Sequence, residues 1–413
     1  MLIFITFYIL INLTIESYIQ YNFKTELNKE YIDNYVNSII NNNEYIEIEI
    51  GKSKQKIPFN IRFNEFPFYI MGSESKSYYI YNEKQSLSYK NLSNNYTKFN
   101  NYDYNCYGIY SSETFYFNNT GKNSIKEKEN FPFYLVKSNK NNLPGLIGLK
   151  LNSFFDEDYY SFIKQLKNHS IIQNYIFSIK YLNDTNGEFL IGNFPLIEKY
   201  NKENFNFALT EIDGNANLWE LKFDKISFGN EIIPENRLLN FVIELGVIKA
   251  PYIFLDIFEK KYVDRKTCFK ILLRRKYNTF YCNKNFSLEN FPSLFFYNKE
   301  LNYTFELNYN DLFVEKDNLY HLLMIFEYQS QYHWKMGKPF LKKYQFIYDF
   351  DRRAIGYLVN TEIKSKFNIG ILIIFILLGL IFISLFILFK YFKIKRKKRL
   401  NEIDDNFLYI PQN

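Results

Sequence analysis

Histidine and cysteine are scarce in this sequence of 413 residues, which contains three of each. The histidines are too few and too widely spaced for a metal site: His169, His321 and His333. No Cys-x-x-Cys pair occurs. Oxidation of Cys268 with Cys282 would close a loop of about 15 residues and stabilise the fold by roughly 3 kcal/mol. We expect Cys106 to be a small buried thiol and not an intermolecular link. The sequence therefore predicts no metal and no other cofactor.

A large excess of charge of one sign is absent from most of the chain. Lys and Arg number 51 against 44 Asp and Glu, which gives a formal net charge of +7. Residues 390–413 hold seven basic and three acidic residues, so +4 of this charge belongs to the tail and +3 to the rest. A nucleic-acid surface needs a concentrated basic face, so the sequence predicts no nucleic-acid partner.

Two long apolar runs lie at the two ends of the chain. The run at residues 1–13 has the length of the apolar region of a signal peptide, and we assign residues 1–17 to one. The run at residues 369–389 has about 20 uncharged residues, enough for a helix to span a bilayer. Seven basic residues follow it and mark the cytoplasmic side. The sequence therefore predicts a single-pass type I membrane protein with a cytoplasmic tail at residues 390–413.

Seven Asn-x-Ser/Thr triplets lie between the predicted signal peptide and the predicted span, and they agree with this topology because all of them precede the span. They start at Asn91, Asn95, Asn118, Asn168, Asn183, Asn285 and Asn302. We expect a glycosylated ectodomain in the secretory pathway or at the cell surface, on the luminal or extracellular side.

The abundance of Asn, Lys, Ile, Tyr and Phe indicates an AT-rich genome, as in many parasitic protists. We therefore assign the 20% of aromatic residues to the core and not to a ligand cage.

Short strands dominate the residues between the two ends. EYIEIEI at residues 44–50 alternates polar and apolar side chains and stops at Gly51. FNIRF at residues 59–63 alternates in the same way, with Arg62 on its polar side. Helical spacing occurs in residues 156–169 and 253–263. These patterns predict an all-β ectodomain of one or two lobes with few short helices.

Several stretches together resemble the pepsin-like aspartic peptidases. The strongest is WKMGKPFLKKYQFIYDFDRRAIGYL at residues 334–358, which repeats the family's spacing of Trp, Gly, Phe, Tyr and Asp. The other matches follow in the family's order: YN at 81–82 with SLSY at 86–89, GLIGL at 145–149, FSI at 177–179, GEFLIG at 187–192, WEL at 219–221, and Cys268 and Cys282 with FPSLF at 291–295. Together these matches cover nearly the whole ectodomain.

The resemblance implies a bilobal, all-β fold with a cleft between an N-terminal lobe at 44–185 and a C-terminal lobe at 186–358. Residues 18–43 would then be a propeptide or an N-terminal extension. Active members hold one aspartate of each lobe in an Asp-Thr/Ser-Gly triplet. Because two carboxylates about 3 Å apart cannot both ionise, they share one proton. One carboxyl then activates water while the other protonates the scissile carbonyl.

Neither triplet occurs in this sequence. Alignment from Ile50 and Gly51 places Arg62 at the first catalytic aspartate, so a permanent cation stands where the resemblance requires an acid. At the second aspartate, counting back from Pro251 gives Val242, and a shift of two residues gives Glu244. Both registers stay open at this point.

The flap that closes over the cleft in this family is altered as well, because its tyrosine position falls on Asn101, with Tyr102 beside it. We therefore predict a pseudo-peptidase that binds an extended peptide or protein in the interlobe cleft without cleaving it. If Arg62 lies on the cleft floor, it favours an acidic group on that ligand. The two alternatives are an active membrane-anchored aspartic endopeptidase with shifted catalytic residues and a structural surface protein.

Overall fold

The computed structural model describes most of residues 18–358 and a short part of the C-terminal region. The described residues are 18–26, 35–41, 43–65, 67–75, 77, 79–100, 105–119, 124–138, 144–151, 161–192, 205–209, 218–233, 238–262, 267–327, 333–358, 384–386 and 388–396. The chain divides into two units, Met1–Val359 and Asn360–Asn413.

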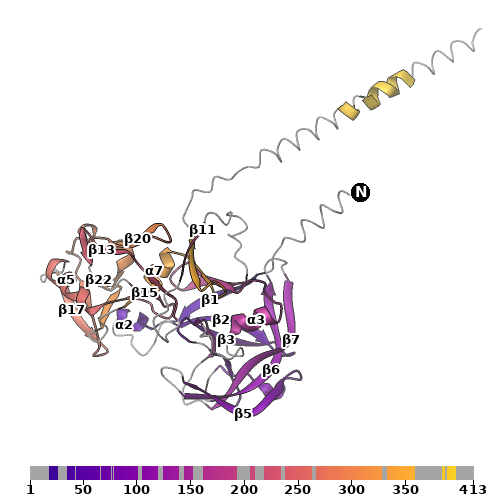
Figure 1. Ribbon diagram of the computed structural model, residues 1–413, viewed down its shortest axis with the longest axis horizontal. Helices are drawn as coiled ribbons and strands as arrows, with labels where there is room; N and C mark the ends of the chain where they lie inside the picture. The colour runs from indigo at the N-terminus through magenta and orange to yellow at the C-terminus, as the bar shows by residue number, and fades with distance from the viewer. Residues whose placement is uncertain are drawn as a thin grey trace, which may run out of the picture. The chain divides into compact units, whose positions relative to one another are not determined.

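Most of the described residues of the larger unit lie in strands, and thirteen of the described strands form one sheet in the order β11-β26-β25-β9-β10-β1-β2-β3-β8-β4-β7-β6-β5. Their bounds are β1 Ile19–Glu26, β2 Asn43–Ile50, β3 Gln55–Arg62, β4 Phe68–Met71, β5 Lys90–Asn100, β6 Asn105–Asn119, β7 Ser124–Ser138, β8 Gly145–Gly148, β9 Ile176–Tyr181, β10 Asn186–Ile191, β11 Phe205–Leu209, β25 Phe346–Asp349 and β26 Ala354–Leu358. Figure 1 shows the long strands β5, β6 and β7 together at one end of this sheet.

The described strands between residues 220 and 336 form two further sheets, of nine and four strands. The larger contains β12 Glu220–Lys222, β15 Leu238–Phe241, β16 Ile248–Ala250, β17 Cys268–Leu273, β18 Tyr277–Cys282, β21 Phe313–Lys316, β22 Leu319–Leu322, β23 Met324–Glu327 and β24 Trp334–Met336. The smaller contains β13 Lys225–Phe228, β14 Glu231–Ile233, β19 Leu294–Asn298 and β20 Tyr303–Leu307. The predicted boundary between lobes, at residue 185, lies in the turn that joins β9 to β10.

Alternation in the sequence explains why β2 forms where it does. Ile46, Ile48 and Ile50 are buried on one face of the strand, as the period of two requires. β1 lies between β10 and β2, and its side chains Tyr21 and Phe23 are buried. Part of the segment before residue 44 is therefore an interior strand of the larger sheet.

The two lobes contain the same four-strand arrangement. In the first lobe, β8 pairs parallel with β3 and antiparallel with β4, and β4 pairs parallel with β7. In the second, β24 pairs parallel with β15 and antiparallel with β16, and β16 pairs parallel with β23. In the first arrangement the loop after β3 lies beside the end of the parallel strand β8. In the second, the loop after β15 lies beside the end of the parallel strand β24.

The helices in the described residues are short. They are α2 Tyr35–Ile39, α3 Phe162–Asn168, α5 Tyr252–Tyr262, α6 Tyr309–Leu312 and α7 Lys338–Lys343, with 3-10 turns at Glu83–Gln85 and Leu288–Asn290. The helix predicted at 253–263 is confirmed by α5, and the described part of the helix predicted at 156–169 is confirmed by α3, while residues 156–160 lie outside the described residues. Ser161 caps α3 by accepting a hydrogen bond from the Lys164 amide at 3.4 Å.

Aromatic side chains fill the core, as the composition predicts. Phe177 and Tyr348 stack at 4.8 Å between ring centroids, and the buried Trp219 contacts both rings edge-on at 5.6 and 5.2 Å. The Trp219 indole donates to the backbone oxygen of Leu149 at 2.6 Å. This bond ties the start of the second lobe to the first.

The predicted disulfide between Cys268 and Cys282 is present and joins directly opposed residues of β17 and β18. Cys106 is buried in β6 and has a free thiol.

Described residues of the smaller unit are helical at 384–386 and 388–396. Most of the predicted span at 369–389 lies outside the described residues, as do residues 1–17 and most of the tail. Within the part of the chain that the structure describes, no helix has the length and apolar character needed to cross a membrane.

Candidate functional site

Arg62 ends β3 at the point where the two lobes meet. Its side chain is half-buried, and the guanidinium donates to the Asn43 side-chain oxygen at 2.7 Å. In the parallel pairing of β3 with β8, Arg62 lies opposite Gly148. A guanidinium keeps its proton in proteins, so this position supplies neither a general base nor a general acid.

The loop after β15 brings a carboxylate to the same place from the other lobe. The Glu244 carboxylate accepts hydrogen bonds from the Phe63 amide at 3.3 Å and from the Asn64 side-chain nitrogen at 3.2 Å. It therefore faces an amide and a carboxamide across the interface between the lobes. These bonds join the two loops directly.

Val242 lies two residues before Glu244 and is buried. Its amide donates to the Met336 carbonyl oxygen at 3.0 Å, which continues the pairing of β15 with β24. Asn60 pairs with Leu146 in the first lobe, and Asn240 pairs with Lys335 in the second. Leu146 also pairs with Tyr69 of the antiparallel strand β4, and Lys335 pairs with Lys249 of the antiparallel strand β16, so Leu146 and Lys335 are equivalent. Arg62 and Val242, each two residues later than the paired asparagine, therefore hold matching places in the two arrangements.

The residues that follow Arg62 and Val242 are apolar and buried. The Phe63 ring packs against Phe177 at 5.5 Å and against Tyr348 at 4.9 Å, in edge-on contacts. Ile243 is fully buried. Neither loop therefore offers a hydroxyl at this position to hold a carboxylate.

A second carboxyl group, on Glu44 of β2, lies beneath this interface. Glu44 is 1% exposed and accepts hydrogen bonds from the Tyr181 hydroxyl at 3.2 Å and the Thr25 hydroxyl at 3.4 Å. Burial raises the pKa of the Glu44 carboxyl to about 7, against the opposing effect of the Lys338 and Arg62 charges.

The Glu244 charge also raises the pKa of Glu44, so the two carboxyl groups are close enough to interact. Within the described part of the chain, no hydrogen bond joins them, because Glu44 is held by hydroxyl groups and Glu244 by an amide and a carboxamide. Sequence reasoning missed Glu44. The available signal was its place in EYIEIEI, where it shares the buried face with Ile46, Ile48 and Ile50.

The N-terminal segment 35–41 covers the second loop. Val36, Ile39 and Ile40 form a buried cluster with residues of the second lobe that include Val242 and Leu245. Asn41 also forms an isolated antiparallel bridge with Leu245.

Arg274, at the tip of the β17–β18 hairpin, clamps this segment. Its guanidinium donates to the Asn37 side-chain oxygen and to the Asn37 carbonyl oxygen, both at 2.8 Å. The N-terminal segment 35–41 is therefore held against the second lobe by apolar packing and by charge-assisted hydrogen bonds.

The remaining predicted positions divide between exposed and undescribed residues. All seven asparagines of the glycosylation triplets are exposed. Asn101 and Tyr102, the predicted flap positions, lie outside the described residues between β5 and β6. In the described part of the chain, no three His, Cys, Asp or Glu side chains are close enough to hold a metal ion.

A sequence comparison matches one protein family, and a structural comparison matches one fold. The sequence model of the eukaryotic aspartyl proteases matches residues 44–358. A search of curated proteins gives no match. Among solved structures, this chain is similar to conglutin gamma, a basic 7S globulin from lupine seeds, with a TM-score of 0.62 and 12% identity. That match covers 83% of this chain and 95% of conglutin gamma, and at such low identity it shows the fold alone.

Proposed function

Since this chain belongs to the eukaryotic aspartyl protease family, we propose that it is a pseudo-peptidase, which keeps the bilobal pepsin-like fold without peptide-bond hydrolysis. We assign Arg62 and Val242 to the places of the two catalytic aspartates. The matching pairings of Asn60 with Leu146 and Asn240 with Lys335 support Val242 over Glu244.

One observation carries this proposal: the Glu244 carboxylate meets the Phe63 amide and the Asn64 side chain instead of a second carboxyl group. Hydrolysis by this scaffold needs two carboxyls that share a proton and exchange the roles of acid and base. A cation at Arg62 and an alkyl group at Val242 supply neither role.

The ligand that we propose is an extended peptide or protein segment in the interlobe cleft, bound through backbone hydrogen bonds and side-chain pockets. Arg62 favours an acidic group on this ligand. Because the N-terminal segment 35–41 packs on Val242 and Leu245, a ligand that reaches this part of the cleft has to displace it.

We also propose that the protein is anchored in a membrane by residues 369–389, with the pepsin-like unit on the luminal or extracellular side. The exposure of all seven glycosylation asparagines supports this orientation.

The decisive experiment incubates the full chain, in detergent micelles, with an unfolded protein substrate from pH 2 to pH 8. We expect no cleavage at any pH, while an active aspartic peptidase in the same micelles degrades the substrate. A second assay titrates a library of extended peptides, for which we expect saturable binding without cleavage. If the chain binds no extended peptide and still does not cleave, the structural surface protein is the better interpretation.

An active endopeptidase is the alternative that one observation favours, namely the electrostatic coupling of Glu44 with Glu244. It predicts cleavage at acid pH that a statine-type inhibitor blocks and that Glu44→Gln and Glu244→Gln each abolish. Cleavage with this pattern would overturn the pseudo-peptidase proposal.

A further inference from the structure

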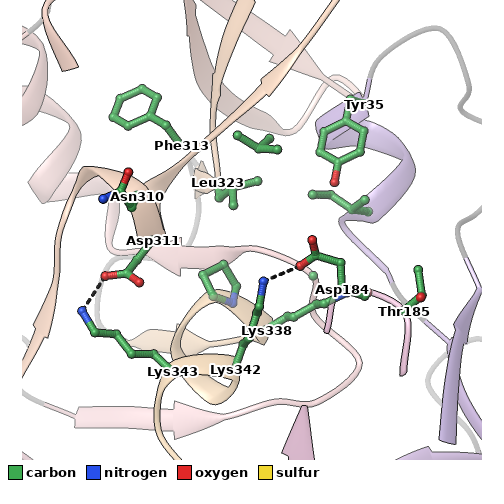
Figure 2. A pocket seen from close by; sticks show the side chains of 14 residues that line it. Tyr35, Asp184, Thr185, Asn310, Asp311, Phe313, Leu323, Lys338, Lys342 and Lys343 are labelled. Carbon is green, nitrogen blue, oxygen red and sulfur yellow. Dashed lines mark hydrogen bonds and ion pairs between the residues drawn. The ribbon is translucent and has the colours of Figure 1, made fainter. Parts of the chain in front are cut away.

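A pocket of about 360 Å³ lies beside the N-terminal segment 35–41, and nothing in the proposed function uses it. Its volume is within the range of about 300–1,000 Å³ that ligand pockets usually have. Figure 2 shows that its walls come from α2, the β9–β10 turn, α6, β21 and α7.

The two sides of the pocket differ in chemistry. Three lysines of α7, at positions 338, 342 and 343, line one side together with the carboxylates of Asp184 and Asp311, which leaves one excess positive charge. The rest of the lining is mostly apolar, from Ile39, Phe313, Val314, Leu323 and Pro339, and it also includes Gly246 and the polar side chains of Tyr35, Thr185 and Asn310.

Each lysine ammonium has donors to spare. The Lys342 ammonium donates to the Asp184 carboxylate at 2.7 Å, and the Lys343 ammonium donates to the Asp311 carboxylate at 2.6 Å (Figure 2). The Lys338 ammonium donates to the Asp184 backbone oxygen. An ammonium group carries three N–H donors. In the described part of the chain, each of the three lysine ammonium groups has a single hydrogen-bond acceptor.

The two aspartates hold the lysine side chains in place but neutralise only part of their positive charge. Hydrogen bonding to Lys342 lowers the pKa of Asp184, so this carboxylate stays charged. Burial lowers the pKa of Lys338, which indicates that its ammonium lies in a poorly hydrated part of the site. An anion that enters there replaces missing water and gains charge-assisted hydrogen bonds.

We propose that this pocket binds a small organic acid, with its carboxylate on the α7 lysines and its apolar body against Leu323 and Phe313. This inference goes beyond the proposed function, because the pocket needs neither a cleft ligand nor catalysis. Tyr35 and Ile39 belong to the N-terminal segment 35–41. The acid therefore binds only while this segment is seated, and it stabilises that arrangement.

The test uses 3-phenylpropionate, which has a carboxylate, an aromatic body and a size that suits the pocket. The full chain in lipid nanodiscs is titrated at pH 7.4 by ligand-observed NMR, with empty nanodiscs as the blank. For a ligand of this size we expect a Kd of about 1 mM. The neutral 3-phenylpropanamide, which has the same shape, should bind at least about tenfold more weakly.

Two variants locate the binding. Lys338→Met removes the ammonium and should weaken phenylpropionate binding about tenfold or more. Leu323→Trp fills the pocket and should abolish binding without removing a charge, which keeps the test valid if Lys338→Met fails to fold. The control Lys222→Met changes an exposed lysine outside the pocket and should leave binding unchanged. Equal binding of acid and amide, retained binding in Leu323→Trp, or no binding up to about ten times the expected Kd would each overturn the proposal.

Discussion

At the scale of single residues, the place where the two lobes meet contains a network of side-chain hydrogen bonds. Arg62 is engaged by Asn43, and Glu244 is engaged by Phe63 and Asn64. The two Glu244 contacts join segments 181 and 180 positions apart in the sequence, whereas the Arg62 contact joins the neighbouring strands β2 and β3. The Arg62 and Glu244 side chains therefore hold neighbouring segments of the fold together.

Glu44 makes the stability of the fold depend on pH. Its folded-state pKa of about 7 is above the usual value of 4.5. The folded state therefore binds the extra proton, so this contribution is fully present below pH 4.5 and is lost as the pH rises through about 7. A shift of about 2.5 units corresponds to about 3 kcal/mol.

We expect Glu44→Gln to remove this slope of the unfolding free energy between pH 4.5 and pH 7. Denaturant titrations of the full chain in micelles, followed by the fluorescence of the buried Trp219 and Trp334, measure it. A variant that keeps the slope of the parent protein would show that another group titrates.

Glu244→Ala tests the bonds between the two loops. Loss of this carboxylate leaves the Phe63 amide and the Asn64 side chain without their acceptor, so we expect the unfolding free energy to fall by about 1–3 kcal/mol. The matched control is Glu289→Ala, at an exposed position, for which the change should stay within about 0.5 kcal/mol. An effect as small as that of the control would mean that water replaces these bonds.

At the scale of elements, the predictable parts are those that local patterns specify. Alternation in EYIEIEI placed the strand that the structure shows as β2, and helical spacing placed α5 within one residue at each end. The family resemblance predicted the bilobal, mostly β fold. The stretches around Trp219 and Trp334 supply side chains that pack in the core, so the resemblance does not depend on the catalytic residues.

The position of α2 against the second lobe could not be predicted from local patterns. α2 has only five residues, YVNSI, and its position depends on Arg274, which is 237 positions away in the sequence. Its partner Asn37 looks like any surface asparagine in a chain rich in asparagine. The proposed assignment of Val242 in place of Glu244 likewise rests on strand pairings, since the spacing in the sequence fits both.

Arg274→Ala should loosen the N-terminal segment 35–41. Removal of two charge-assisted hydrogen bonds to Asn37 should speed amide hydrogen exchange in this segment about tenfold or more. The neighbouring Arg275→Ala is the matched control, because Arg275 is exposed in the same hairpin turn. If the segment competes with a cleft ligand, Arg274→Ala should also tighten peptide binding; unchanged exchange in both variants would contradict the clamp.

The disulfide of the β17–β18 hairpin supports the same clamp. The double variant Cys268→Ser with Cys282→Ser opens a loop of about 15 residues, so we expect the unfolding free energy to fall by about 3 kcal/mol. Denaturant titration measures the fall, and Cys106→Ala, which keeps the disulfide, serves as the comparison. A double variant as stable as the parent chain would show that the hairpin is held by its other contacts.

At the scale of the whole molecule, the glycosylation triplets give a direct test of orientation. If the pepsin-like unit is luminal or extracellular, the exposed asparagines are accessible to the glycosylation machinery. We expect the expressed full chain to lose apparent mass on treatment with an N-glycan-removing amidase. Replacement of Asn91 and Asn95 by Gln should remove part of that shift, and a chain without any shift would argue against the proposed orientation.

The position of β25 and β26 has a consequence for synthesis. These strands, Phe346–Leu358, cover β9 in the thirteen-stranded sheet, and β1 lies on the other side of the β9–β10 hairpin. A nascent chain therefore cannot close its main sheet until almost all of residues 1–358 have left the ribosome. Polypeptides that stop short of residue 346 would display β9 as an open edge, the kind of surface that invites aggregation and chaperone capture.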